Sequence, residues 1–201
     1  MVIGLIIILI ILVLLSIYLI FYRPINSKIE KTFFKINCAK KIYMVAKNHD
    51  CYLLNKVAIK VEGKIIHFDH ILFGDKFIYC IVTRYYSVAL NGKLDDASWF
   101  HYFRNNDFEI IKNPLRLNKE RVDYFSSLIT SSKEIFVGML IVNNSCLIDK
   151  IEGVSNNELL INIRDFEKTI KRYEQNESVT PIEPHSLKLL VKDIYSKCIE
   201  E

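Results

Sequence analysis

Residues 65–84 read IIHFDHILFGDKFIYCIVTR, two apolar runs joined by Gly74-Asp75. Both runs are rich in β-branched and aromatic residues and neither repeats with a helical period, so the stretch predicts a hairpin of two largely buried strands. Two charged residues interrupt it, Asp69 in the middle of the first run and Arg84 at the end of the second. Because a buried charge needs a partner or a task, the sequence predicts that Asp69 and Arg84 pair across the hairpin.

Short motifs follow one another in and after this hairpin: Phe68-Asp69-His70-Ile71, Ile81-Val82-Thr83-Arg84, Gly92, Trp99 and Asn113-Pro114-Leu115-Arg116-Leu117-Asn118. Their order resembles that of the nuclease-related domain (NERD) family, a branch of the PD-(D/E)xK nuclease superfamily. The resemblance covers roughly residues 38–142. It implies an α/β fold of the restriction-endonuclease type, in which a mixed sheet is flanked by helices.

The positions that carry the chemistry of that family differ in this chain. Family members read Ile-Glu-Thr-Lys where this chain has Ile81-Val82-Thr83-Arg84; there the Asp and Glu hold a divalent metal, and the Lys orients or activates the attacking water. Valine offers no lone pair to a hard cation, and arginine keeps its proton at ordinary pH. The family's helical Gly-Glu pair falls on Cys38-Ala39, with Glu30 too early in the chain. The resemblance therefore implies a degenerate site of Asp69 and Arg84, with Asp69 the one remaining metal ligand.

Three interpretations of this site stay open from the sequence. In the first, an inactive module binds nucleic acid or a protein, and Arg84 contacts a phosphate without hydrolysing it. In the second, an active nuclease binds Mg²⁺ or Mn²⁺ through Asp69 and a migrated carboxylate, for which Asp95 and Asp96 are candidates. In the third, the domain is an interaction platform without a nucleic-acid role. No P-loop, dinucleotide fingerprint or Ser-His-Asp order occurs, so no small-molecule cofactor is expected.

The histidines and cysteines do not predict a metal site. His67 and His70 flank Asp69, but residues three apart on a strand point to opposite faces, so the pair is not expected to share an ion with it. The sequence indicates no partner for the other histidines: His49, His101 and His185. The cysteines are odd in number and lack CxxC spacing, which is typical of reduced thiols: Cys38, Cys51, Cys80, Cys146 and Cys198.

The N-terminal residues 2–22 carry no charge and are almost entirely aliphatic or aromatic. At about 1.5 Å per residue they cover the ~30 Å hydrocarbon core of a bilayer, so they predict a transmembrane helix. A basic start, a short apolar core and a small-residue cleavage site are missing, so a retained anchor is expected rather than a signal peptide. Residues 23–47 hold seven basic side chains and one acidic side chain. By the positive-inside rule, the N-terminus lies outside and the following domain in the cytoplasm.

The net charge of +4 therefore hides an asymmetry along the chain. Residues 48–201 carry twenty basic and twenty-two acidic side chains, so the positive charge lies beside the predicted anchor. Each Lys or Arg near anionic lipid contributes about 1 kcal/mol, so residues 2–47 are expected to contact membrane lipid. The predicted organisation is a single-pass cell-membrane protein with an anchor at 2–22, a basic juxtamembrane segment at 23–47 and a cytoplasmic NERD-like domain at 48–201.

The remaining elements follow from local patterns. Residues 25–46 predict a helix with an apolar stripe of Ile29, Phe33, Ile36, Ile42, Val45 and Ala46. Asn91-Gly92 predicts a tight turn, Trp99–Phe103 an aromatic core cluster, and Asn113-Pro114 a break before a helix beginning near Asn118. Further elements are expected as strands at 51–61, 135–142 and 159–163, a helix at 165–173, and a last helix introduced by a capping box at Thr180–Glu183.

Overall fold

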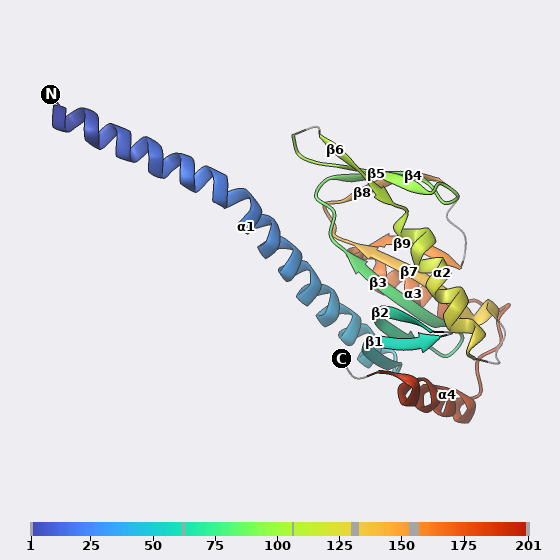
Figure 1. Ribbon diagram of the computed structural model, residues 1–201. Coiled ribbons are helices and arrows are strands. Elements are labelled where there is room, and N and C mark those ends of the chain that lie inside the picture. Colours follow the sequence, from blue (N-terminus) through green and yellow to red (C-terminus); the bar gives the residue numbers. More distant parts are fainter. Residues whose placement is uncertain (1, 62, 106, 130–132, 153–156, 200–201) are drawn as a thin grey trace. The chain divides into compact units, whose positions relative to one another are not determined.

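The computed structural model describes the backbone of residues 2–61, 63–105, 107–129, 133–152 and 157–199. Within these ranges, some residues are described by their backbone alone: 2–6, 8, 17, 19–27, 133, 149 and 150. The chain divides into two compact units, Met1–Asn37 and Cys38–Glu201 (Figure 1). The second unit holds both β-sheets and the predicted site.

The first helix, α1, runs over Val2–Asn48 and includes both the predicted span and the predicted helix at 25–46. Among the residues described, no helix has the length and apolar character needed to cross a membrane. The predicted span at 2–22 includes residues whose side chains are not among those described. The predicted apolar stripe is wrong in its first half, because Ile29, Phe33 and Ile36 are exposed and precede the second unit. The buried positions of the helix in that unit are Cys38, Ile42, Val45 and Ala46.

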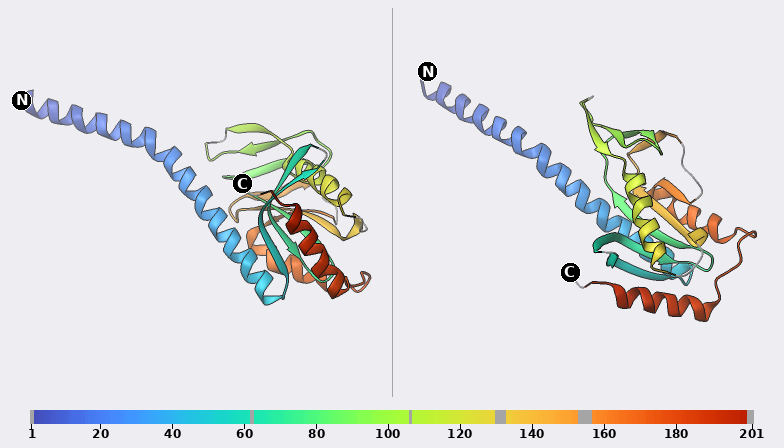
Figure 2. Two further views of the ribbon diagram at one scale, coloured as in Figure 1. Left: turned by 60° about the horizontal axis from the view of Figure 1, so that its bottom comes forward. Right: turned by 45° about the vertical axis from the view of Figure 1, so that its right-hand side comes forward.

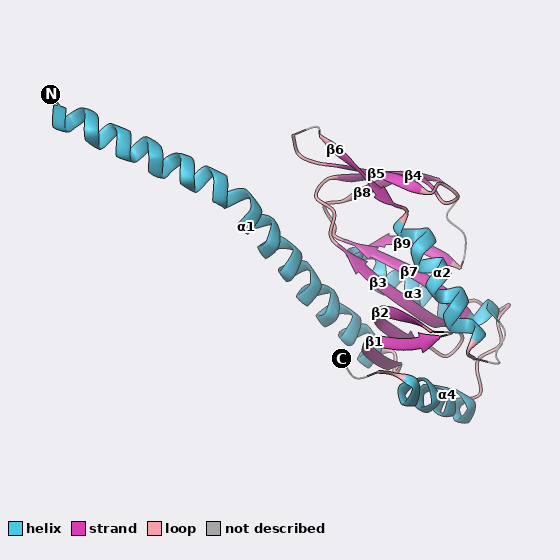
Figure 3. Ribbon diagram, in the orientation of Figure 1, coloured by secondary structure: helices cyan, strands magenta, loops and turns pink. Residues whose placement is uncertain are grey.

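The larger sheet has five strands in the order β1-β2-β3-β7-β9. The predicted hairpin is confirmed as an antiparallel pair of strands, and β7 and β9 extend the sheet in parallel from β3. This gives the mixed sheet that the sequence predicted (Figure 3). The strands are β1 Tyr52–Val61, β2 Lys64–Phe73, β3 Ile78–Arg84, β7 Phe136–Val142 and β9 Glu158–Asn162.

Helices cover both faces of this sheet (Figure 2). Helix α2, Pro114–Ser127, packs on the face of Cys80, where the amide Nδ2 of Asn118 donates to the Cys80 carbonyl at 3.3 Å. Neighbouring residues of a strand point to opposite faces. Accordingly, Tyr79 meets Tyr173 of α3, Phe166–Glu174, edge to face at 6.3 Å between ring centroids. The last helix is α4, Pro184–Lys197.

Helices α2 and α4 both begin at a proline, and the start of each differs from the prediction. Helix α2 begins at Pro114 rather than near Asn118, because proline at the first helical position has no N–H to satisfy and its φ suits a helix. Asn113 is its N-cap. In α4, the N-cap is Glu183, whose carboxylate accepts from the backbone of His185 and Ser186, so the predicted Thr180 capping box is wrong.

The smaller sheet has four strands in the order β6-β5-β4-β8. Its strands are β4 Ala89–Lys93, β5 Ser98–Tyr102, β6 Phe108–Lys112 and β8 Leu147–Glu152. Asn91-Gly92 is not a turn, because it pairs within β4 and the chain reverses after Lys93. The predicted aromatic core cluster is right only in part: Trp99 and His101 are buried, but Phe100, on the alternate face of β5, is 40% exposed.

Candidate functional site

The carboxylate of Asp69 lies where the pairing of β2 with β3 stops. The last backbone pair of that ladder is His70 with Ile81. Beyond it, Oδ2 of Asp69 accepts from the backbone N–H of Thr83 at 2.6 Å and from its hydroxyl at 3.0 Å. The side chain of Asp69 thus replaces the next rung of the sheet, which holds it firmly against β3.

A local distortion of β1 and β2 directs the side chain of Asp69 there. Lys56 of β1 has a left-handed φ of 51° and lies between the residues of the pairs Asn55–His70 and Val57–Phe68. Asp69 lies between the same two pairs on β2. Strict alternation would separate Phe68 and Ile71, yet both lie in the same core cluster. The alternation of side chains along β2 therefore breaks at Asp69, and the carboxylate of Asp69 does not follow the regular alternation between the two faces of the sheet.

Arg84 pairs with Asp69, as predicted across the hairpin. Its Nη1 lies 3.4 Å from Oδ2 of Asp69 and also donates to the Thr83 carbonyl at 2.8 Å. The pair is not buried as the sequence predicted, because the Arg84 and Asp69 side chains are 42% and 35% exposed. An ion pair with this exposure contributes about 0–1 kcal/mol, so the guanidinium can exchange part of it for another anion at small cost.

The positions at which relatives carry metal ligands do not fit a divalent cation. Val82 is 3% exposed and belongs to the hydrophobic core, so it presents no oxygen. On α1, burial, with a smaller effect of Asp69, raises the pKa of the Cys38 thiol to about 12 and keeps it neutral. Arg84 places its positive charge beside the remaining carboxylate, that of Asp69. Mg²⁺ and Mn²⁺ take oxygen ligands, so this set does not suit them.

The sequence did not indicate a third charged group whose charge acts on the site, Arg121. Burial, together with the charge of Arg84, lowers the pKa of Arg121 on α2, and Asp69 opposes this shift. The charges of Arg84 and Arg121 therefore both act on the region of Asp69, and positive charge prevails among these three groups. The signal in the sequence is weak: Arg121 follows Asn118 by three residues, and residues three apart lie on the same side of a helix.

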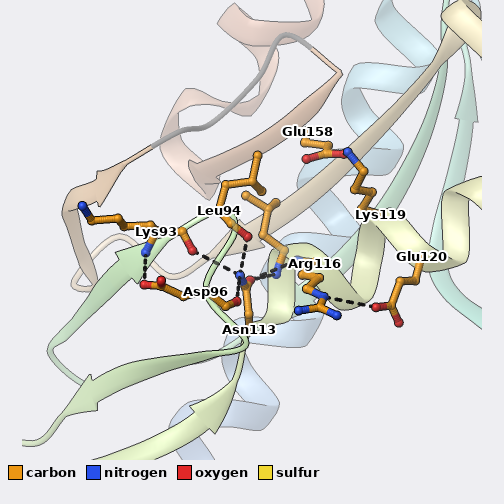
Figure 4. A network of polar contacts seen from close by, with 9 residues as sticks. Lys93, Leu94, Asp96, Asn113, Arg116, Lys119, Glu120 and Glu158 are labelled. Carbon is orange, nitrogen blue, oxygen red and sulfur yellow. Dashed lines mark hydrogen bonds and ion pairs between the residues drawn. The ribbon is translucent and has the colours of Figure 1, made fainter.

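The acidic residues proposed as migrated ligands lie in the loop between β4 and β5. Oδ2 of Asp96 accepts from the backbone N–H of Lys93 at 2.9 Å. Asp95 lines a pocket of about 240 Å³ together with Leu94, Arg116 and Lys119; the last three are drawn in Figure 4. Among the contacts of the described residues, none joins Asp95 or Asp96 to Asp69. Across the described part of the chain, no group of three or more His, Cys, Asp or Glu side chains could hold a metal ion.

Two histidines have structural partners that the sequence did not indicate. His101 lies between Glu109, at 2.8 Å from Nδ1 to Oε1, and the backbone N–H of Ser87, at 3.1 Å from Nε2. The ring of His70 is buried, and its Nδ1 lies 2.6 Å from Oδ1 of Asn55. These contacts hold the strands together. The five cysteines are free thiols, which agrees with the reduced state expected from their spacing.

Protonation of His70 is expected to destabilise the fold in mild acid. Burial lowers its pKa below the ordinary value of 6.5, although Asp69 opposes the shift. The stability contributed by neutral His70 is therefore complete above pH 6.5 and is lost as the pH falls through the lower pKa of the folded state. Denaturant unfolding of the full-length chain across this range measures the loss. His70→Gln should flatten the profile and His185→Gln, at an exposed position of α4, should not; equal profiles would contradict the assignment.

The fold and the site together define a nuclease-like α/β module: a mixed sheet whose second and third strands bring a carboxylate and a basic side chain to one point. A comparison with family profiles agrees, since the profile described as nuclease-related domain, NERD, matches residues 36–144, more than half of the chain. The chain belongs to the NERD family, as its motifs predicted, and membership of the PD-(D/E)xK superfamily is consistent with this.

Two further comparisons add little. No curated protein matches the chain. One solved structure, described as the crystal structure of a protein of unknown function, AF1548, aligns at 9% identity and a TM-score of 0.39, covering 76% of this chain and 74% of that one. A similarity of this size supports no conclusion about fold or function.

Proposed function

We propose that this chain is a NERD module that has lost metal-dependent cleavage and binds a phosphate group of a nucleic acid through Arg84. The observation that carries the proposal is the contact of Arg84 Nη1 with Oδ2 of Asp69, at 3.4 Å. It puts a guanidinium, which binds phosphate through forked hydrogen bonds, at the point where relatives hold a metal. The buried Val82 supports the loss of cleavage, because valine offers no oxygen at the position where the family motif has its second carboxylate.

The proposal includes attachment to the cell membrane. The uncharged residues 2–22 have the length of a membrane span, and the basic residues 23–47 suit the anionic inner leaflet. In this arrangement the N-terminus lies outside, and the NERD module meets its ligand in the cytoplasm. Fractionation of cells that express the tagged full-length chain tests the attachment; recovery in the soluble fraction after an alkaline wash would contradict it.

Loss of the guanidinium is expected to weaken nucleic-acid binding. Arg84→Ala should raise the Kd for a labelled oligonucleotide by about tenfold and reduce the salt dependence by roughly one released counterion. Fluorescence anisotropy with single- and double-stranded DNA and RNA, over a series of salt concentrations, measures both effects. Arg164→Ala is the matched control, since this arginine is 66% exposed and pairs with its neighbour Asp165. If the parent chain binds none of these oligonucleotides, the proposal is wrong.

Restoring the family's residues is expected to restore a metal site. In Val82→Glu/Arg84→Lys, a second carboxylate joins Asp69 and the competing guanidinium is removed. We expect Mg²⁺ or Mn²⁺ to raise the Tm of this variant but not of the parent, and cleavage of an oligonucleotide to accompany the shift. Asp69→Ala in the same background should abolish both responses. Metal-dependent cleavage by the parent chain that is lost in Asp69→Ala would instead establish an active nuclease.

A further inference from the structure

Strand β6 forms one edge of the smaller sheet, and among the described residues no strand pairs with its outer side. β6 is the first strand in the order β6-β5-β4-β8 and pairs with β5 alone among the described residues (Figures 1 and 3). The outer strand β1 of the larger sheet differs, because the C-terminal segment pairs with it: the N–H of Ile199 donates to the Ala58 carbonyl at 2.8 Å. An open strand edge is a template for pairing with another chain.

The backbone groups of β6 that face outward can be assigned from the ladder. The N–H of Phe103 donates to the Asp107 carbonyl, and the N–H of Asn113 to the Ala97 carbonyl. Hydrogen-bonded pairs alternate along an antiparallel ladder, so the odd-numbered residues of β6 bond to β5. The even-numbered residues, Phe108, Ile110 and Lys112, therefore direct their N–H and C=O groups toward the open edge.

Two large apolar side chains along this edge are exposed to solvent. Phe108 is 55% exposed and Ile110 is 67% exposed. On the same face of the sheet, Phe100 of β5 lies edge to face with Phe108, at 5.5 Å between ring centroids. Proline or a bulge often protects such an edge, but β6 pairs regularly with β5 and contains no proline.

We propose that β6 pairs with β6 of a second copy of the chain, antiparallel and centred on Ile110, to join the two smaller sheets into one. This register sets Ile110 against the partner's Ile110, and Phe108 against the partner's Lys112. All three outward-facing residues then form hydrogen-bonded pairs, with two backbone bonds in each. Lys112 lies across from an aromatic ring, and Glu109 lies across from the partner's Ile111, so no like charges oppose each other.

Other registers fit less well. A shift by one residue would set inward-facing against outward-facing residues, and the side chains of each pair would point to opposite faces. A shift by two residues leaves one of the three outward-facing residues of each copy without a pair. The strand is therefore self-complementary in one register, which is the requirement for a symmetric dimer.

The charge of the hairpin favours a second copy over a polyanion. Residues 98–112 contain two basic side chains, Arg104 and Lys112, and two acidic side chains, Asp107 and Glu109. A hairpin without net charge does not attract nucleic acid over a distance, although its exposed rings resemble a stacking surface. The inference does not rest on the proposed function, since the edge is separate from Asp69 and Arg84.

A designed disulfide tests the register. In the proposed dimer, the two Ile110 Cα atoms lie about 5.5 Å apart, within the range of a disulfide. Full-length Ile110→Cys in mild detergent, with the half-buried Cys51 and Cys198 changed to serine, should form a covalent dimer on mild oxidation. Phe100→Cys in the same background is the control, because the two β5 strands lie about 14 Å apart across three strand spacings. Equal crosslinking of both variants, or of neither, would overturn the register.

Disruption of the edge tests the dimer itself. Ile110→Pro removes an outward-facing N–H and leaves the ladder with β5 intact, and Ile110→Lys sets two like charges directly opposite. Both should weaken dimerisation at least about tenfold in sedimentation or light scattering of the full-length chain, with unchanged circular dichroism. A parent chain that stays monomeric at every concentration, or a dimer that survives both substitutions, would overturn the proposal. Oligonucleotide binding that is lost in Phe100→Ala and Phe108→Ala, by a monomeric parent, would assign the face to nucleic acid instead.

Discussion

Asn113→Ala is expected to lower the free energy of unfolding by about 3 kcal/mol. The side chain, 1% exposed, joins the N-terminus of α2 to the loop between β4 and β5 (Figure 4). Its Oδ1 accepts from the backbone N–H groups of Leu115 and Arg116, both at 3.0 Å. Its Nδ2 donates to the carbonyls of Lys93, Leu94 and Asp96, at 3.2, 2.8 and 2.8 Å.

Alanine would remove all of these contacts at once. The N-cap alone is worth about 1 kcal/mol, and the loss of the three hydrogen bonds that Nδ2 donates adds the rest. Urea unfolding of the full-length chain, followed by circular dichroism, measures the loss. Asn91→Ala, at a half-buried position of β4, is the matched control and should change the free energy by less than about 0.5 kcal/mol. A cost for Asn113→Ala no larger than that of the control would contradict the role given to Asn113.

Gly92→Ala is expected to be as damaging, at about 3 kcal/mol, because there is no room for a side chain at this position. A Cβ on Gly92 would lie 2.2 Å from Cδ1 of Trp99. The indole cannot move away readily, since it is fully buried and its Nε1 donates to the Lys93 carbonyl at 2.7 Å. Gly63→Ala is the control: its φ of +81° strains an alanine, but nothing lies within 4 Å, so the cost should be about 1–2 kcal/mol.

A double-mutant cycle tests whether the clash with Trp99 is the cause. Trp99→Leu shortens the opposing side chain and opens space beside Gly92. Gly92→Ala should then cost at least about 1 kcal/mol less in the Trp99→Leu background than in the parent. Unfolding is followed by circular dichroism, because Trp99 is the one tryptophan of the chain. Equal costs in both backgrounds would show that some other contact of Gly92 decides its stability.

The contacts of Gly92 and Asn113 explain three of the motif residues that this chain shares with the family. Gly92, Trp99 and Asn113 act on structure: the glycine and the tryptophan pack against each other, and the asparagine ties the smaller sheet to α2. Asn118, also a motif residue, fixes the same helix to β3. The motifs could therefore identify the family even though Val82 and Arg84 depart from its Ile-Glu-Thr-Lys motif.

The sequence by itself determined the elements whose signal is local. The apolar runs at 65–73 and 76–84 predicted the central hairpin, and the run at 135–142 predicted the buried strand beside it. The chemistry of Val82 and Arg84 also follows from residue type alone, because valine has no donor atom and arginine keeps its charge. The register of the hairpin then brought Asp69 and Arg84 together, since antiparallel pairing is fixed once the turn and the buried faces are known.

Only the tertiary structure decided how open the site is and which groups surround it. The left-handed φ of Lys56 and the broken alternation at Asp69 depend on how β1 and β2 fit against β3, which no short pattern encodes. The charge of Arg121 acts on Asp69 because α2 packs on the sheet, over a separation of 52 residues that periodicity does not reveal. The open edge of β6 likewise exists only because of the order of strands in the smaller sheet. Contacts of this kind form between segments distant in the chain, so their geometry is set by packing rather than by local preference.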